Sequence, residues 1–142
     1  MQLIASAGNA REVKKMDRLA DALNAVKVAE LKGIPETLVA PASKLIREVF
    51  LLFQQADYLG EFEFIDDGKS GKLLVKLRGK INNCKAIKPR FPVKFLEWEK
   101  WERRFLPGAG IGLIIVSTPK GLMTHASAKE QRLGGRLVCF VY

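Results

Sequence analysis

Residues 111–121 read IGLIIVSTPKG, a short apolar run that leads directly into a turn. The run from Ile111 to Val116 has the length and the branched aliphatic residues of a fully buried β-strand. It is far shorter than the roughly 20 apolar residues that a membrane span requires. Pro119 and Gly121 then favour a turn. This stretch therefore predicts a buried strand in the second half of the chain, followed by a turn that carries two hydroxyls and a lysine.

The segments that precede this strand predict an edge strand and a helix. From Ile87 to Phe95, apolar residues alternate with lysine and arginine, which is typical of a strand with one apolar and one basic face. Pro89 and Pro92 would confine such a strand to a sheet edge or a bulge. Residues 96–106 predict a helix on which two tryptophans and a phenylalanine share a face. This spacing favours packing in the core over a base-stacking platform.

The remaining residues complete a basic, β-rich module over residues 82–142. A short segment after the turn and a helix near residues 126–132 lead to Gly134 and Gly135. Residues 137–142 predict a final strand.

The first half of the chain predicts an α-β-α-β-β module over residues 16–81. Apolar residues recur at helical spacing from Met16, and Gly33 is a stop signal. Ser43 is a plausible N-cap for the second helix, and a hairpin turns at residues 66–71. Residues 1–15 are expected to form a tail. The predicted fold class is α+β, with two small α/β modules that meet near residue 82.

Most of the positive charge lies in the second half. The chain has 142 residues and a net charge of +9, and residues 81–142 contain 11 lysines and arginines against 4 acidic residues. A one-sided basic surface is typical of a nucleic-acid binder. The N-terminus lacks the pattern of a signal peptide, and the two distant cysteines give neither a disulfide framework nor zinc spacing. We therefore expect an intracellular protein that binds nucleic acid.

The turn after the buried strand is the strongest local signal for function. Hydroxyls and exposed backbone N–H groups bind phosphate, ribose and base edges, and glycine allows close approach to the backbone. The candidate RNA-contacting residues of this turn and the segment behind it are Ser117, Thr118, Lys120, Gly121, Thr124 and His125. Gly134, Gly135 and Arg136 form a second candidate contact. Lys88 and Arg90 on the basic strand face are further candidates, which a solvated face explains equally well.

Other classes of function find less support in the residues. His125 has no serine or cysteine partner at the spacing of a catalytic triad, and Asp66 and Asp67 lie beside glycines, as in a hairpin turn. The glycines at 108–112 precede a strand, whereas a dinucleotide fingerprint joins a strand to a helix. We therefore expect no catalytic residue, no metal and no cofactor. Two alternatives stay open, a small metal-dependent nuclease and a protein-interaction module that exposes its tryptophans.

Several motifs resemble the small-subunit ribosomal protein S-eight family. They occur in consistent order from Met16 to Tyr142, which makes the resemblance specific. The first two motifs resemble the opening of the family, and the next two resemble its archaeal and eukaryotic branch. The motifs are DRLADALNA (17–25), PASKL (41–45), EFEFIDDG (61–68), IKPRFPVK (87–94), WERRFLP (101–107), IIVST (114–118) and GGRL (134–137).

The resemblance implies a non-catalytic structural protein of the small ribosomal subunit, located in the cytoplasm. Its partners would be the central domain of the small-subunit rRNA, whose assembly it would help to organise, and neighbouring ribosomal proteins. In the family two turns contact an RNA helix and its internal loop, and their counterparts here are Ser117, Thr118, Lys120, Gly121, Gly134 and Gly135. A second contact, from the first module, maps to Asn24, Lys27, Ser43 and Lys44. The alternative is a non-ribosomal RNA-binding or protein-interaction module.

Two positions depart from the family pattern. Pro119 stands where serine is common, which removes a hydroxyl and a backbone donor. Arg136 stands where bacterial members tend to carry an acidic residue. The contacts at these two positions are therefore expected to differ from those of relatives.

Overall fold

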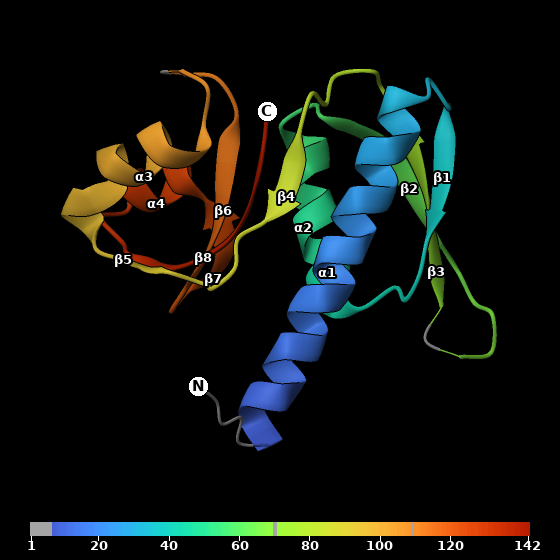
Figure 1. The fold of residues 1–142 in the computed structure, drawn as a ribbon, viewed down its shortest axis with the longest axis horizontal. Helices are drawn as coiled ribbons and strands as arrows, with labels where there is room; N and C mark the ends of the chain where they lie inside the picture. The colour runs from blue at the N-terminus through green and yellow to red at the C-terminus, as the bar shows by residue number, and fades with distance from the viewer. Residues whose placement is uncertain (1–6, 70, 109) are drawn as a thin grey trace.

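The computed structural model describes residues 7–69, 71–108 and 110–142, with side chains from Arg18 onward. Within these residues the chain forms four α-helices and two antiparallel sheets that lie side by side (Figure 1). The elements in chain order are α1 (Ala7–Leu31), β1 (Glu36–Val39), α2 (Lys44–Gln55), β2 (Leu59–Ile65), β3 (Lys72–Leu77), β4 (Cys84–Ala86), β5 (Pro92–Val93), the 3-10 helix η1 (Phe95–Glu97), α3 (Trp98–Phe105), β6 (Leu113–Thr118), β7 (Gly121–Thr124), α4 (His125–Glu130) and β8 (Gly135–Val141). This mixture confirms the predicted α+β fold class.

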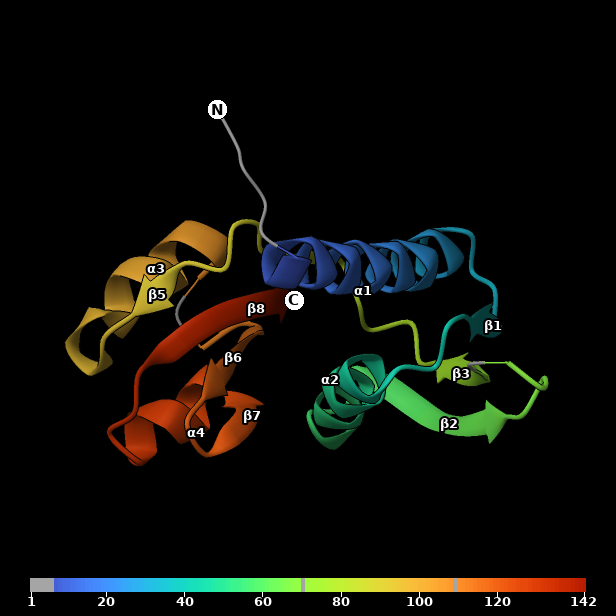
Figure 2. The ribbon, with the colours of Figure 1, turned by 90° about the horizontal axis from the view of Figure 1, so that it is seen from below.

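The first sheet and its two helices form the predicted α-β-α-β-β arrangement. The strand order is β1-β3-β2, and α1 and α2 lie on the side of this sheet that faces the second one (Figure 2). Ser43 caps α2, because its Oγ accepts a hydrogen bond from the N–H of Ile46 at 3.3 Å. In the β2–β3 turn, the Asp67 carboxylate accepts hydrogen bonds from the N–H groups of Lys69 and Gly71. The predicted cap and hairpin turn are therefore confirmed.

Helix α1 begins earlier than the sequence predicts. It starts at Ala7, so the expectation of a tail over residues 1–15 is wrong for residues 7–15, while residues 1–6 lie outside the described part. Alanine, arginine, glutamate and lysine dominate residues 10–15, and these residues favour helices. In the described part of the chain no helix, α1 included, is long and apolar enough to cross a membrane.

The second sheet is built around the buried strand that was predicted over residues 111–116. Its strand order is β4-β8-β6-β7, and β5 also pairs with β8. Strand β6 begins at Leu113 instead of Ile111, because Gly112 has a φ of +84° that interrupts the extended backbone. The strand continues to Thr118, so both hydroxyl residues of the predicted turn belong to the strand.

The predicted edge strand over residues 87–95 does not form as one piece. Two short strands, β4 and β5, pair with the neighbouring strand β8, and residues 87–91 connect them without regular structure. Pro89 and Pro92 cannot donate a backbone hydrogen bond, which limits how far a ladder can extend there. The predicted position at a sheet edge is correct, but the continuous basic face is not.

The two sheets share one hydrophobic cluster. Leu23 of α1 and Val49 of α2 pack in the same cluster as Cys84, Ile115 and Cys139 of the second sheet. Helix α1 contacts both β1 and β4, which joins the two halves of the chain.

A second cluster lies beneath α3 and contains both tryptophans. Trp98 and Trp101 are buried, and the Trp98 indole N–H donates a hydrogen bond to the Leu133 carbonyl at 3.2 Å. The predicted core role of the tryptophans is therefore confirmed, and they do not form an exposed interaction face.

Candidate nucleic-acid interface

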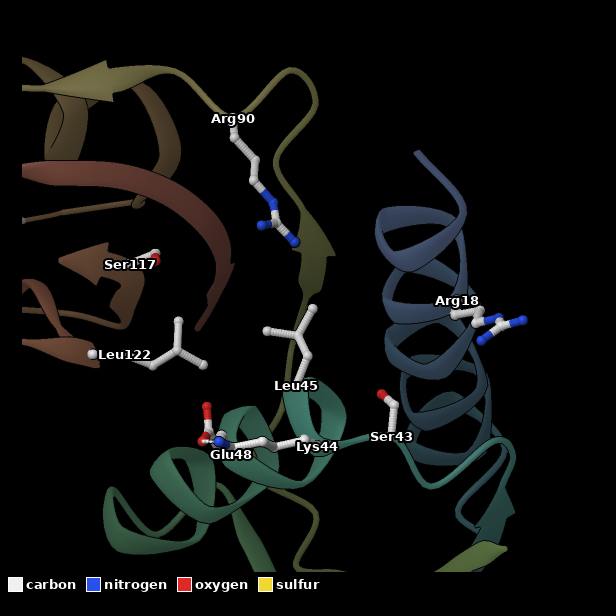
Figure 3. A pocket seen from close by; sticks show the side chains of 9 residues that line it. Arg18, Ser43, Lys44, Leu45, Glu48, Arg90, Ser117 and Leu122 are labelled. Carbon is white, nitrogen blue, oxygen red and sulfur yellow. Dashed lines mark ion pairs between the residues drawn. The ribbon is translucent and has the colours of Figure 1, made fainter. Parts of the chain in front are cut away.

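A cleft lies where α2, the 87–91 segment and the β6–β7 turn meet (Figure 3). Its volume is about 490 Å³. We call it the central cleft, and its lining residues are Arg18, Ser43, Lys44, Leu45, Glu48, Arg90, Ser117, Gly121 and Leu122. Residues that are far apart in the sequence but were predicted to contact RNA thus surround one hollow.

The start of α2 forms one side of the central cleft. Because Ser43 caps this helix, the positive end of the helix dipole lies at the cleft beside the Lys44 ammonium group. Lys44 is exposed, and its ion pair with Glu48 is long at 4.0 Å, so it is a weak surface pair that leaves the ammonium group accessible. Arg18 lines the cleft through its stem, while its guanidinium group points away (Figure 3).

The β6–β7 turn forms the opposite side, and its two hydroxyls have different roles. Thr118 pairs with Gly121 across the ladder, so Pro119 and Lys120 form an exposed two-residue loop. The Thr118 Oγ1 accepts a hydrogen bond from the Lys120 N–H at 3.1 Å and donates one to the Gly121 carbonyl at 2.8 Å. Thr118 is only 8% exposed. Ser117 is half-buried at the cleft, and no described residue forms a hydrogen bond with its hydroxyl, which is therefore the one available to a ligand.

Thr124 and His125 face the protein instead of the cleft. The Thr124 Oγ1 accepts a hydrogen bond from the Ser127 N–H at 3.2 Å and caps α4. The His125 Nδ1 accepts one from the Ile114 N–H at 3.0 Å, its Nε2 lies 3.5 Å from Glu102 Oε1, and its side chain is only 12% exposed. Thr124 thus caps α4 and His125 joins that helix to β6, and the direct contact of both residues with RNA stays a prediction.

Burial lowers the pKa of His125 below its usual value of 6.5, although Glu102 opposes this shift. The imidazole must be neutral at Nδ1 to accept the Ile114 N–H bond. The unfolded chain therefore binds a proton more readily than the folded chain, and stability is lost as the pH falls below about 6.5. We expect the free energy of unfolding in urea to decrease between about pH 7.5 and pH 5.

His125 is the only histidine in the sequence, which gives this prediction a clean control. An asparagine at this position offers an acceptor but does not titrate. The decrease in stability should therefore be smaller in the His125→Asn variant. An equal decrease in both proteins would show that other groups cause it.

Gly134 and Gly135 allow close packing next to the turn. A Cβ at Gly135 would lie 2.1 Å from the Ser117 carbonyl oxygen, and one at Gly134 would lie 2.3 Å from the Val93 carbonyl oxygen. Only a glycine fits at these distances, so both positions have a steric role, and their contact with RNA stays a prediction. Arg136 follows as an exposed residue and pairs with Ser117 in the β6–β8 register.

A second hollow, which we call the α1–β4 groove, contains the other predicted contacts. Its volume is about 450 Å³, and its lining residues are Ala20, Asn24, Lys27, Cys84, Lys85, Ala86 and Lys88. None of these described residues is acidic. Lys85 was not predicted, although it stands between the buried Cys84 and Ala86 in the alternation typical of an edge strand.

The thiol in this groove is not a nucleophile. Burial raises the pKa of Cys84 to about 12, and the thiol donates a hydrogen bond to the Leu23 carbonyl at 3.3 Å. Burial also raises the pKa of Cys139. A thiol rather than a thiolate is therefore present at neutral pH, and the groove offers cations and an amide to a ligand.

A comparison with known protein families identifies the family of this chain. The family model described as Ribosomal protein S8 matches residues 17–142, which cover both sheets, the central cleft and most of α1. Members of that family are structural components of the small ribosomal subunit, which is cytoplasmic, and they bind rRNA and neighbouring ribosomal proteins. The chain that forms this cleft and groove belongs to the ribosomal protein S8 family.

Proposed function

We propose that this chain binds the central domain of the small-subunit rRNA directly and helps to organise that domain during assembly. The main contact would be the rim of the central cleft, and the α1–β4 groove would be the second. We also propose that the chain belongs to the archaeal and eukaryotic branch and that its two modules meet near residue 82.

The observation that carries this proposal is the meeting of two distant sets of residues around one hollow. Ser43 and Lys44 come from the first half, and Arg90, Ser117 and Gly121 come from the second. A rigid set of hydroxyl, backbone and cationic groups can bind the sugar–phosphate backbone and base edges of a shaped RNA. The net charge of +9 supplies the long-range attraction for such a ligand.

The structure supports different roles for the residues in and beside the turn. Ser117, Lys120, Gly121 and Arg136 present accessible groups next to the cleft, and these would contact RNA. Thr118 fixes the turn from inside through both of its hydrogen bonds.

The α1–β4 groove supports a more generic contact. Lys27, Lys85 and Lys88 line this groove together with Asn24, and cationic and amide side chains suit a phosphate backbone. This contact would position the RNA, while the central cleft would select it.

We expect Ser117→Ala and Thr118→Ala to separate contact from support. Ser117→Ala should weaken binding to a central-domain rRNA fragment about fivefold to tenfold, the value of one hydroxyl hydrogen bond, without changing the free energy of unfolding. Thr118→Ala should lower both the affinity and the free energy of unfolding, because it removes the hydrogen bonds that hold the turn. Fluorescence anisotropy titrations and urea denaturation measure the two quantities.

Ser127→Ala is the matched control, since Ser127 lies in α4 and is not part of the cleft lining. It should bind RNA like the unsubstituted chain. If Ser117→Ala bound the fragment as tightly as Ser127→Ala, the Ser117 hydroxyl would not be a contact.

A further inference from the structure

The walls of the central cleft are not those of a simple phosphate site. Leu45 of α2 and Leu122 of β7 form an apolar surface within it (Figure 3). Phosphate groups gain nothing from aliphatic side chains, whereas the flat face of a nucleobase packs well against them. The apolar wall therefore favours a base as the occupant of the cleft.

Glu48 supports the same conclusion from its charge. Its carboxylate lines the cleft, and its only ion pair among the described residues is the 4.0 Å contact with Lys44. A carboxylate repels phosphate and only accepts hydrogen bonds. The group that enters the cleft should therefore present donors toward Glu48.

Arg90 supplies the complementary chemistry. Its side chain extends from the 87–91 segment into the cleft (Figure 3). Its Nε is buried and has no hydrogen-bond partner among the described residues. The guanidinium group that carries this N–H points into the cleft, and its planar donors suit an occupant with hydrogen-bond acceptors (Figure 3).

We propose that the central cleft binds a single guanine base that is unstacked from the rRNA. Guanine carries two acceptors, O6 and N7, on one edge, and arginine recognises this pair. Its N1–H and N2–H groups on another edge are donors that suit the Glu48 carboxylate. Adenine has a donor at the position of O6 and no N1–H, so it offers Arg90 only the N7 acceptor and Glu48 only the N6 amino group, and it matches neither side chain with a pair of hydrogen bonds. This inference rests on the proposed rRNA-binding function and assigns the base that the cleft selects.

The substitution Glu48→Gln tests the proposal against simple electrostatics. It removes one negative charge and so raises the net charge by one. A generic phosphate contact would therefore become tighter or stay unchanged. A guanine contact would weaken about tenfold, because the acceptor pair for the base donors is lost. Binding of a central-domain rRNA fragment is measured at about 150 mM salt. Glu63→Gln, an equal charge change at an exposed position on β2, is the control and should not weaken binding.

Chemical probing of the RNA locates the base. Kethoxal reacts with N1 and N2 of unpaired guanines, and the unsubstituted chain should protect one such guanine. Arg90→Lys keeps the charge but loses the planar donors, so it should leave that guanine reactive, as should Glu48→Gln. Thermal unfolding of both variants, compared with that of the unsubstituted chain, checks whether the fold is kept.

Hydroxyl-radical cleavage of the same RNA separates two kinds of failure. If the unsubstituted chain gives no footprint on the central domain, the proposed rRNA contact is wrong, and the guanine site with it. If the footprint is present but no guanine is protected, only the guanine site is wrong. The guanine site is also wrong if Glu48→Gln binds as tightly as Glu63→Gln.

Discussion

Binding to a central-domain rRNA fragment is expected to weaken about a thousandfold when the salt concentration rises from about 50 to about 200 mM. The cleft rim and the α1–β4 groove together present six cationic side chains to the RNA. They are Lys27, Lys44, Lys85, Lys88, Lys120 and Arg136. Each contact with a phosphate releases condensed counterions, so six contacts give this steep dependence. Anisotropy titrations over a series of salt concentrations measure the slope of log affinity against log salt.

Single lysine substitutions test which cations take part. Lys85→Gln, in the groove, should reduce the magnitude of the slope by about one. Lys76→Gln should leave the slope unchanged, because Lys76 is exposed on β3 of the first sheet and lines neither hollow. A slope for the unsubstituted chain that corresponds to only one or two phosphates would contradict the two-contact interface.

Gly135→Ala is expected to lower the free energy of unfolding by about 3 kcal/mol, at the upper end of the usual cost of overpacking. The added Cβ would lie 2.1 Å from the Ser117 carbonyl oxygen and 3.1 Å from the Val116 side chain. Both neighbours belong to the buried strand β6, so the sheet must distort to admit the methyl group. Since Ser117 forms part of the cleft rim, RNA affinity should fall as well. Urea denaturation and anisotropy titrations measure the two effects.

Gly108→Ala is the matched control for this substitution. The only neighbour within 4 Å of its added Cβ among the described residues would be the tip of Ile111, at 3.4 Å, which is an ordinary contact. We expect its stability and affinity to remain close to those of the unsubstituted chain. If Gly135→Ala were as stable as Gly108→Ala, the close packing of β8 against β6 would be incorrect.

Local signals in the sequence predict the features that short segments decide. The Ser43 cap, the aspartate turn at residues 66–71 and the buried helical face with Trp98 and Trp101 all follow from neighbouring residues. These features depend on capping, turn chemistry and hydrophobic spacing, and the structure confirms each of them.

Contacts between distant segments could not be predicted in the same way. Nothing in a single sequence shows that Glu48 and Leu122 line one cleft, or that Gly135 lies against the Ser117 carbonyl. The residue types around the turn also do not reveal their roles, because a threonine hydroxyl can bind either a ligand or the backbone of neighbouring residues. In Thr118 it does the latter, and only the tertiary structure distinguishes the two.

The most direct test of the rRNA-binding account is a competition titration. A labelled central-domain fragment of small-subunit rRNA is bound by the unsubstituted chain at about 150 mM salt, and unlabelled RNA of the same length is added in excess. We expect the unlabelled central-domain fragment to displace the label and a scrambled RNA to leave most of it bound. Equal displacement by both RNAs would show that the chain binds RNA through its charge alone, which would contradict a specific site at the central cleft.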